Sequence, residues 1–265
     1  MKKVTVFIGS ARKKLTHYAV HQFLDHLQSL GDVEYEIVVL SEHRLETCRG
    51  CCVCFKKGEE FCPLRDDRDV LFNKIMASDG IVFATPNYSF HVSAITKIFL
   101  DRFGFIFHRP RFFGKAFTSI VAQGIYGGGK IVRYFDFAGG GLGFNTVKGR
   151  CITAFDPMTD KDRQKIDRAL AELSRRFYMR LMQPAFSAPT LLKLLGFRMA
   201  RTSMRLMLDD SSRDYTYYKE KGWFESDYYY PTRLSPPKKA AGRLFDSIAT
   251  ISSRKKMGAV TSAQK

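Results

Sequence analysis

The chain has 265 residues, 45% of them hydrophobic, and carries a formal net charge of +17. This length suits one large domain, or one domain with an appendage, and the apolar content excludes a wholly disordered chain. No apolar stretch approaches the roughly 18–20 residues of a membrane-spanning helix, and the apolar run at 4–8 is too short for a signal peptide. We therefore expect a cytoplasmic protein whose cysteines stay reduced.

Five short apolar runs predict buried β-strands, and helical spacing of apolar residues predicts helices between them. The strands are expected at 3–8, 35–40, 80–85, 116–122 and 147–154. The helices are expected at 15–30, after Asp66-Asp67, at 92–107, after Gly129 and at 160–181. This alternation predicts a doubly wound α/β fold, in which helices cover both faces of a five-stranded parallel sheet. Ligands of such sheets bind beyond the carboxyl ends of the strands.

The first loop after a predicted strand, 9–17, has residues suited to a phosphate. Gly9 permits a tight turn, and hydroxyl groups with the backbone amides of the next helix can donate hydrogen bonds. Arg12 and Lys14 add positive charge. The loop lacks G-x-G-x-x-G and the P-loop sequence, so a monophosphate ester, such as a flavin mononucleotide, suits it better than a dinucleotide. An ordinary helix start capped by Ser10 is the alternative interpretation.

Two further loops follow predicted strands, at 85–91 and 123–129. The first reads Thr-Pro-Asn-Tyr-Ser-Phe-His, and Tyr88 and Phe90 offer flat surfaces on which a planar ring can lie. The second holds consecutive glycines, which let the backbone approach a ligand closely. The alternatives are core packing of the aromatic residues and a flexible linker. We interpret His91 as a helix-start residue rather than a catalyst.

The sequence pattern changes after Pro184. Residues 191–208 have the spacing of an amphipathic helix with a basic face, 215–230 are rich in aromatic residues, and Ser235-Pro-Pro indicates a break. We expect a core domain at 1–182. A mostly helical extension, 183–265, is expected to pack on that core or on a partner subunit.

The positive charge is concentrated toward the C-terminus, because roughly two thirds of the excess lies after Asp160. A basic surface without a special partner is the simplest interpretation, and an anionic partner is the sharper one. Contact of the helix at 191–208 with a membrane surface is one such alternative. No nucleic-acid-binding motif accompanies the charge, so we expect no nucleic-acid partner.

Five of the six cysteines lie in one stretch. Cys48, Cys51 and Cys54 follow a C-x2-C-x2-C pattern, and Cys62 comes before a proline after a seven-residue gap. Thiolates at this spacing can hold three corners of a [4Fe–4S] cluster, and a distant cysteine followed by proline can supply the fourth. Four thiolates can also bind zinc. Metal-free thiols on a loop near a ligand are the third alternative, and all three stay open.

Several of these segments together resemble the NADPH-dependent FMN reductase family. They are Gly9-Ser-Ala-Arg12, Thr85-Pro-Asn-Tyr88, Lys97-x-x-x-Asp101-Arg102 and the glycine loop at 124–129. The cysteine segment, followed by Asp66-Asp67, resembles the iron-sulfur flavoprotein branch of that family. The resemblance covers roughly residues 1–155. It implies a flavodoxin-like fold that binds FMN, with the phosphate on the loop 10–17 and the ring between the loops 86–90 and 124–129.

The resemblance also implies a function, an FMN-dependent NAD(P)H oxidoreductase of the flavin or quinone reductase type. NAD(P)H is then the co-substrate, a quinone or flavin is the acceptor, and a homodimer or homotetramer is expected. The alternative is an iron-sulfur flavoprotein that carries electrons between a ferredoxin-like donor and an acceptor. No catalytic side chain is named, because the cofactor supplies the chemistry. The implied metal ligands are Cys48, Cys51, Cys54 and Cys62, and the implied FMN-binding residues are Ser10, Arg12, Lys14, Thr16, His17, Pro86, Asn87, Tyr88, Ser89, Phe90, Gln123, Gly124, Tyr126 and Gly127.

Overall fold

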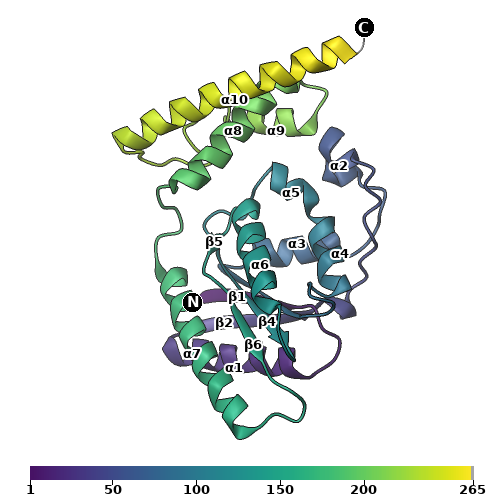
Figure 1. The fold of residues 1–265 in the computed structure, drawn as a ribbon, viewed down its shortest axis with the longest axis vertical. Helices are drawn as coiled ribbons and strands as arrows, with labels where there is room; N and C mark the ends of the chain where they lie inside the picture. Colours follow the sequence, from purple (N-terminus) through teal and green to yellow (C-terminus); the bar gives the residue numbers. More distant parts are fainter. Residues whose placement is uncertain (264–265) are drawn as a thin grey trace. The chain divides into compact units, whose positions relative to one another are not determined.

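The computed structural model describes residues 1–263 and divides the chain into two compact units (Figure 1). The first unit consists of residues 1–49 and 64–185. The second consists of residues 50–63 together with the chain from Phe186 onward. The cysteine segment, apart from Cys48, therefore belongs to the same unit as the C-terminal extension.

The first unit is built on a parallel sheet with the order β2-β1-β3-β4-β5, and β6 also pairs with β4. This is the flavodoxin-like order, and the α/β fold is confirmed. The strand predicted at 147–154 corresponds to the shorter β6, and an additional two-residue strand, β5, pairs with the start of β4 just before it. The strands are β1 (Lys2–Ile8), β2 (Val33–Val39), β3 (Gly80–Pro86), β4 (Ala116–Gln123), β5 (Asn145–Thr146) and β6 (Arg150–Thr153).

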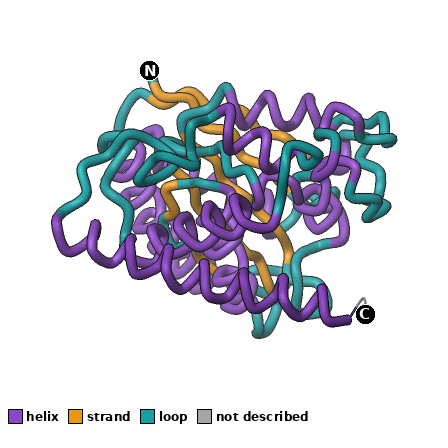
Figure 2. Tube along the Cα trace, turned by 90° about the horizontal axis from the view of Figure 1, so that it is seen from above, coloured by secondary structure: helices purple, strands orange, loops and turns teal. Residues whose placement is uncertain are grey.

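The two faces of the sheet differ in chemistry, because side chains alternate along each strand. Val4, Val6 and Ile8 of β1 face a mainly aliphatic core that also contains side chains of α1 (Leu15–Leu30) and α7 (Asp160–Met182). Phe7, on the opposite face, stacks on Phe99 at 5.2 Å between ring centroids. Aromatic side chains of β3, α4 and α6 continue this second layer, as in the contact of Phe83 with Phe135. Figure 2 shows strands running between helices.

The helices of the aromatic face are α3 (Arg68–Met76), α4 (Ala94–Arg102), α5 (Gly104–His108) and α6 (Gly128–Leu142). The single helix predicted at 92–107 is thus interrupted at Phe103, between α4 and α5. Asp67 precedes α3, but its side chain makes no capping hydrogen bond. Gly143 ends α6 in the left-handed region, with φ 103°, where a side chain would be strained.

The second unit is helical and contains α2 (Val53–Lys56), α8 (Leu191–Met207), α9 (Arg213–Glu220) and α10 (Pro236–Ala263). Helix α2 contacts α9, and α8 packs along α10. The break predicted at Ser235-Pro-Pro lies at the boundary between irregular chain and the start of α10. Proline fits the first position of a helix, and the amide of Lys239 donates to the carbonyl oxygen of Ser235 at 3.0 Å.

The aromatic stretch after α9 forms part of the core of the second unit. Tyr218 and Trp223 are buried and meet edge to face, at 4.9 Å between ring centroids. The indole N–H of Trp223 donates to the carbonyl oxygen of Tyr229 at 2.9 Å, so the buried polar atom is satisfied. In the part of the chain that the structure describes, no helix has both the length and the apolar character needed to cross a membrane.

Candidate functional site

A cavity of about 620 Å³ lies at the carboxyl ends of β1, β3, β4 and β6 in the first unit. The volume is in the range of small-molecule sites. In the sheet, β2 lies on one side of β1 and β3 lies on the other. The strand order therefore reverses between β1 and β3, and the cavity lies at this point. Ten of the fourteen predicted binding residues line it: Ser10, Arg12, Lys14, Thr16, His17, Pro86, Asn87, Tyr88, Gln123 and Gly124.

The loop between β1 and α1 is held by its own hydrogen bonds. The Ser10 hydroxyl donates to the carbonyl oxygen of Arg12 at 3.0 Å, and the buried Nε2 of His17 lies 2.8 Å from the carbonyl oxygen of Ser10. Lys14, at the N-cap of α1, makes no side-chain capping bond. The first amides of α1 therefore lack a side-chain acceptor, and they line a cavity suited to a phosphate.

An acidic residue that the sequence did not single out lies beside the cations of this loop. The carboxylate of Asp156 lies 2.8 Å from Lys14 Nζ and 3.5 Å from the guanidinium of Arg12. The hydrogen bond and the charge of Lys14, with a contribution from Arg12, lower the pKa of Asp156. Asp156 therefore carries a negative charge at neutral pH and offsets the charge of the loop.

Another wall of the cavity comes from the chain after β6, and the sequence analysis did not predict its residues. They include Phe155 and Asp156 in the loop, and Arg163 in the first turns of α7. The Arg163 guanidinium lies over the Tyr18 ring, 6.0 Å from its centroid, and both residues line the cavity. This segment has no glycine or serine pattern typical of a binding loop. Its place at the cavity follows only from the pairing of β6 with β4.

The loop after β3 contains a strained turn. Tyr88 and His91 exchange backbone hydrogen bonds of 3.1 and 3.0 Å, while Ser89 and Phe90 between them have φ values of 48° and 62°. Two consecutive residues with positive φ are typical of a turn that prefers Asn and Gly. A side chain in this region costs on the order of 1–3 kcal/mol, and such strain is concentrated at functional sites.

Two amide side chains connect the strand ends at the cavity. Gln123 Oε1 accepts from the amide of Gly128 at 2.7 Å, and its Nε2 donates to Thr153 Oγ1 at 2.9 Å. Asn87 Nδ2 donates to the carbonyl oxygen of Tyr126 at 2.9 Å. Asn87 Oδ1 is buried without a hydrogen-bond partner, although it belongs to a residue that lines the cavity. A ligand that donates an N–H would satisfy it.

Four predicted residues do not line the cavity: Ser89, Phe90, Tyr126 and Gly127. They lie together nonetheless, because the exposed rings of Phe90 and Tyr126 are 5.3 Å apart. A Cβ atom on Gly127 would lie 2.9 Å from the Phe90 ring, and its φ of 96° also disfavours a side chain. These residues form an aromatic edge beside the cavity wall that contains Asn87.

The cysteines differ in exposure along the segment. Cys48, Cys51 and Cys52 are exposed, Cys54 is half-buried and Cys62 is buried. Among the residues from 1 to 263, no group of three or more His, Cys, Asp or Glu side chains is arranged to hold a metal ion. The metal ligands therefore stay a prediction from spacing, and we assign no step to a cluster.

Comparison with known proteins identifies the family. A sequence model of the NADPH-dependent FMN reductase family matches residues 2–154, more than half of the chain. The chain belongs to this family. It is 29% identical to an iron-sulfur flavoprotein of Archaeoglobus fulgidus over 211 residues. This match covers 76% of this chain and 89% of the relative. An iron-sulfur flavoprotein of Methanocaldococcus jannaschii is 35% identical over 101 residues, covering 38% of this chain and 51% of the relative.

Solved structures share the fold. A crystal structure of RosB has a TM-score of 0.57 at 13% identity, covering 89% of this chain and 92% of RosB. An NAD(P)H:quinone oxidoreductase from Methanothermobacter marburgensis has a TM-score of 0.52 at 16% identity, covering 66% of this chain and 96% of that protein. At these identities the likeness supports the flavodoxin-like architecture alone.

Proposed function

We propose that this chain is an FMN-dependent NAD(P)H oxidoreductase that passes reducing equivalents to a small acceptor, either a quinone or a flavin. The observation that carries the proposal is the cavity at the reversal of strand order, which joins the uncapped start of α1 to an unpartnered acceptor on Asn87. These features suit a phosphate and a ring N–H, both of which FMN has. Family membership supports the same cofactor.

The residues present fit this cofactor, and their roles follow from their chemistry. Bound FMN would supply the ring that accepts a hydride from NAD(P)H. Ser10, the first amides of α1, Arg12 and Lys14 would bind the phosphate, while Asn87 Oδ1 would accept from the ring edge. Tyr88, which lines the cavity, would limit access of water. The Gln123 side chain lines the cavity and connects the end of β4 to β6 and to the start of α6, so it would hold the loop that borders the ring.

An absorbance titration tests this proposal. Adding FMN to the purified protein under anaerobic conditions should give a bound flavin spectrum, which NADPH should bleach and a quinone should restore. The Arg12→Ala, Lys14→Ala double variant should bind FMN at least about tenfold more weakly, because a cation–phosphate contact is worth roughly 1–3 kcal/mol. Protein that stays colourless after FMN is added would overturn the proposal.

A second candidate function is an iron-sulfur flavoprotein that carries electrons from a ferredoxin-like donor. The C-x2-C-x2-C pattern and the similarity to archaeal iron-sulfur flavoproteins favour it. Steady oxidation of NADPH supports the reductase, whereas flavin reduction by ferredoxin alone supports the carrier. Iron and acid-labile sulfide in anaerobically purified protein would support the cluster. A homodimer or homotetramer is part of the proposal in both cases, and light scattering measures it.

Replacing Asp156 with asparagine should strengthen FMN binding. The substitution removes the carboxylate that competes with the phosphate for Lys14 and Arg12. We expect the Kd for FMN to fall by about three- to tenfold at low salt and the gain to shrink at high salt, since exposed charges are screened. Fluorescence titration measures the Kd. Asp32→Asn, an exposed change of equal charge, is the control and should leave it unchanged. A weaker affinity of Asp156→Asn would show that Asp156 holds the loop for FMN.

A further inference from the structure

Helix α10 exposes an apolar stripe. Leu244, Ile248 and Ile251 follow helical spacing and are 59%, 45% and 69% exposed. The inward face of the same helix is marked by Ala249 and Ser253, which are buried. An amphipathic helix of a globular protein normally exposes its polar face. Here the outward face of a 28-residue helix has an apolar stripe from Leu244 to Ile251, about two turns long, in a region where a polar face is expected.

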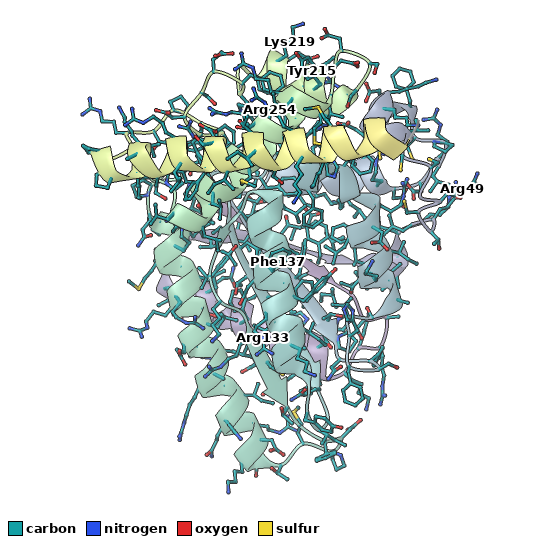
Figure 3. All side chains as sticks on the ribbon, turned by 45° about the horizontal axis from the view of Figure 1, so that its top comes forward. Arg49, Arg133, Phe137, Tyr215, Lys219 and Arg254 are labelled. Carbon is teal, nitrogen blue, oxygen red and sulfur yellow. The ribbon has the colours of Figure 1, made fainter. Side chains whose placement is uncertain are left out.

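The charges on α10 are almost all positive, and its single acid faces inward. The helix contains Lys238, Lys239, Arg243, Arg254, Lys255 and Lys256 against Asp246. Asp246 accepts from Arg198 at 2.9 Å and from Thr202 at 2.8 Å, both on α8. Arg201 lies 2.7 Å from the same carboxylate. The exposed side of α10 therefore combines the apolar stripe with cations and carries no acid; Arg254 is labelled in Figure 3.

From this pattern we infer that α10 binds the surface of a membrane rich in anionic lipid, lying in the plane of the headgroups. Apolar side chains entering the acyl boundary, flanked by cations that meet lipid phosphates, are the features of interfacial helices. A second copy of this chain fits less well, because pairing two such faces would place like charges together. The inference concerns the second unit and does not depend on the proposed function.

The sequence alone pointed to a different helix. It indicates membrane contact, as one alternative, for residues 191–208, which form α8. The middle of α8 is largely covered, because Leu194, Phe197 and Arg198 are buried. Leu191 and Leu192, at the start of α8, are exposed. Lys238 Nζ donates to the carbonyl oxygen of Pro189 at 2.6 Å, so the starts of α8 and α10 are adjacent. These two leucines would extend the apolar surface of α10.

Vesicle flotation of the full-length protein tests the inference. Vesicles of phosphatidylcholine with about 30 mol% phosphatidylglycerol should carry the protein at least tenfold better than vesicles of phosphatidylcholine alone. About 0.5 M NaCl should reduce flotation with the anionic vesicles severalfold. Flotation of the Leu244→Gln, Ile251→Gln double variant with the anionic vesicles should be at least tenfold weaker than that of the unchanged protein. Lys255→Glu with Lys256→Glu should also weaken binding, and this variant leaves the apolar stripe intact.

The control is Met179→Gln with Met182→Gln on α7, because these side chains are 55% and 56% exposed and lie in the first unit. It should float like the unchanged protein, and circular dichroism should show that each variant is folded. Three results would overturn the inference. They are no flotation with anionic vesicles, equal flotation with neutral ones, or a dimer that Leu244→Gln with Ile251→Gln converts to a monomer without any vesicle binding.

Discussion

Replacing Arg102 with methionine should lower the free energy of unfolding by about 3–5 kcal/mol, because it leaves a buried carboxylate without its cation. The side chains of Arg102 and Asp66 are 3% and 1% exposed, and two guanidinium nitrogens of Arg102 donate to the two carboxylate oxygens at 2.9 and 2.8 Å. Asp66 also accepts from the amide of Glu46 at 2.9 Å. The pair therefore fixes both ends of the segment 46–66, which contains the cysteines, against α4. Urea unfolding at neutral pH measures the loss.

The matched control for this variant is Asp101→Asn. It removes the exposed ion pair of Lys97 with Asp101, one residue away on the same helix. An exposed pair of this spacing is worth about 0.3–0.5 kcal/mol, so the change in unfolding free energy should be small. Equal losses in the two variants would contradict the assignment of the stabilising role to the buried pair.

The same pair predicts how stability depends on pH. Burial acts to raise the pKa of Asp66, but the hydrogen bond and charge of Arg102, with the amides of Glu46 and Arg68, lower it below 3.8. A carboxyl group with a lowered pKa stabilises the folded state above its unfolded pKa. That contribution is lost as the pH falls through the lower folded value. The difference between the unchanged protein and Arg102→Met should therefore shrink toward pH 3, which urea midpoints across the acid range would show.

A single methyl group at Gly9 should weaken FMN binding by at least about 100-fold, because the loop would have to move away from α4. A Cβ atom on Gly9 would lie 1.8 Å from Thr96 Oγ1 and 3.0 Å from Ser93 Oγ. The Ser93 hydroxyl also donates to the carbonyl oxygen of Gly9 at 2.6 Å. Overpacking costs about 1–3 kcal/mol in stability, and the displaced amides of α1 would no longer meet the phosphate in the proposed binding mode. Flavin fluorescence titration and thermal unfolding measure the two effects.

A second substitution separates the clash from a general loss of structure. Thr96→Ala removes the oxygen that a Cβ atom on Gly9 would strike, so Gly9→Ala with Thr96→Ala should recover part of the affinity through a favourable coupling energy. Gly140→Ala is the control, because a Cβ atom there meets nothing within 4 Å. The steric explanation would be wrong if Gly9→Ala bound FMN as tightly as the Gly140→Ala control.

The sequence predicted the sheet well because its strands are short continuous apolar runs, as at 81–84 and 120–122, which are typical of strands buried on both faces. It predicted ten of the residues that line the cavity, because they follow strands directly. Asp156 and Arg163 were missed because their nearness to Arg12 and Tyr18 is created by tertiary packing. Helix α10 was missed because consecutive prolines can either interrupt a helix or begin one. The hydrogen bond from the amide of Lys239 to Ser235 shows that here they begin one.

The second unit is assembled from two stretches that are far apart in the sequence, 50–63 and the chain from Phe186 onward. The contact of α2 with α9 joins them. The extension is therefore not a module that a gene fusion could transfer alone, since a graft beginning at Phe186 would leave behind α2. The loop at 50–63 and the chain from Phe186 onward must therefore be kept together for either to keep this packing. A variant that keeps the loop but lacks the chain from Phe186 onward would need another partner for α2.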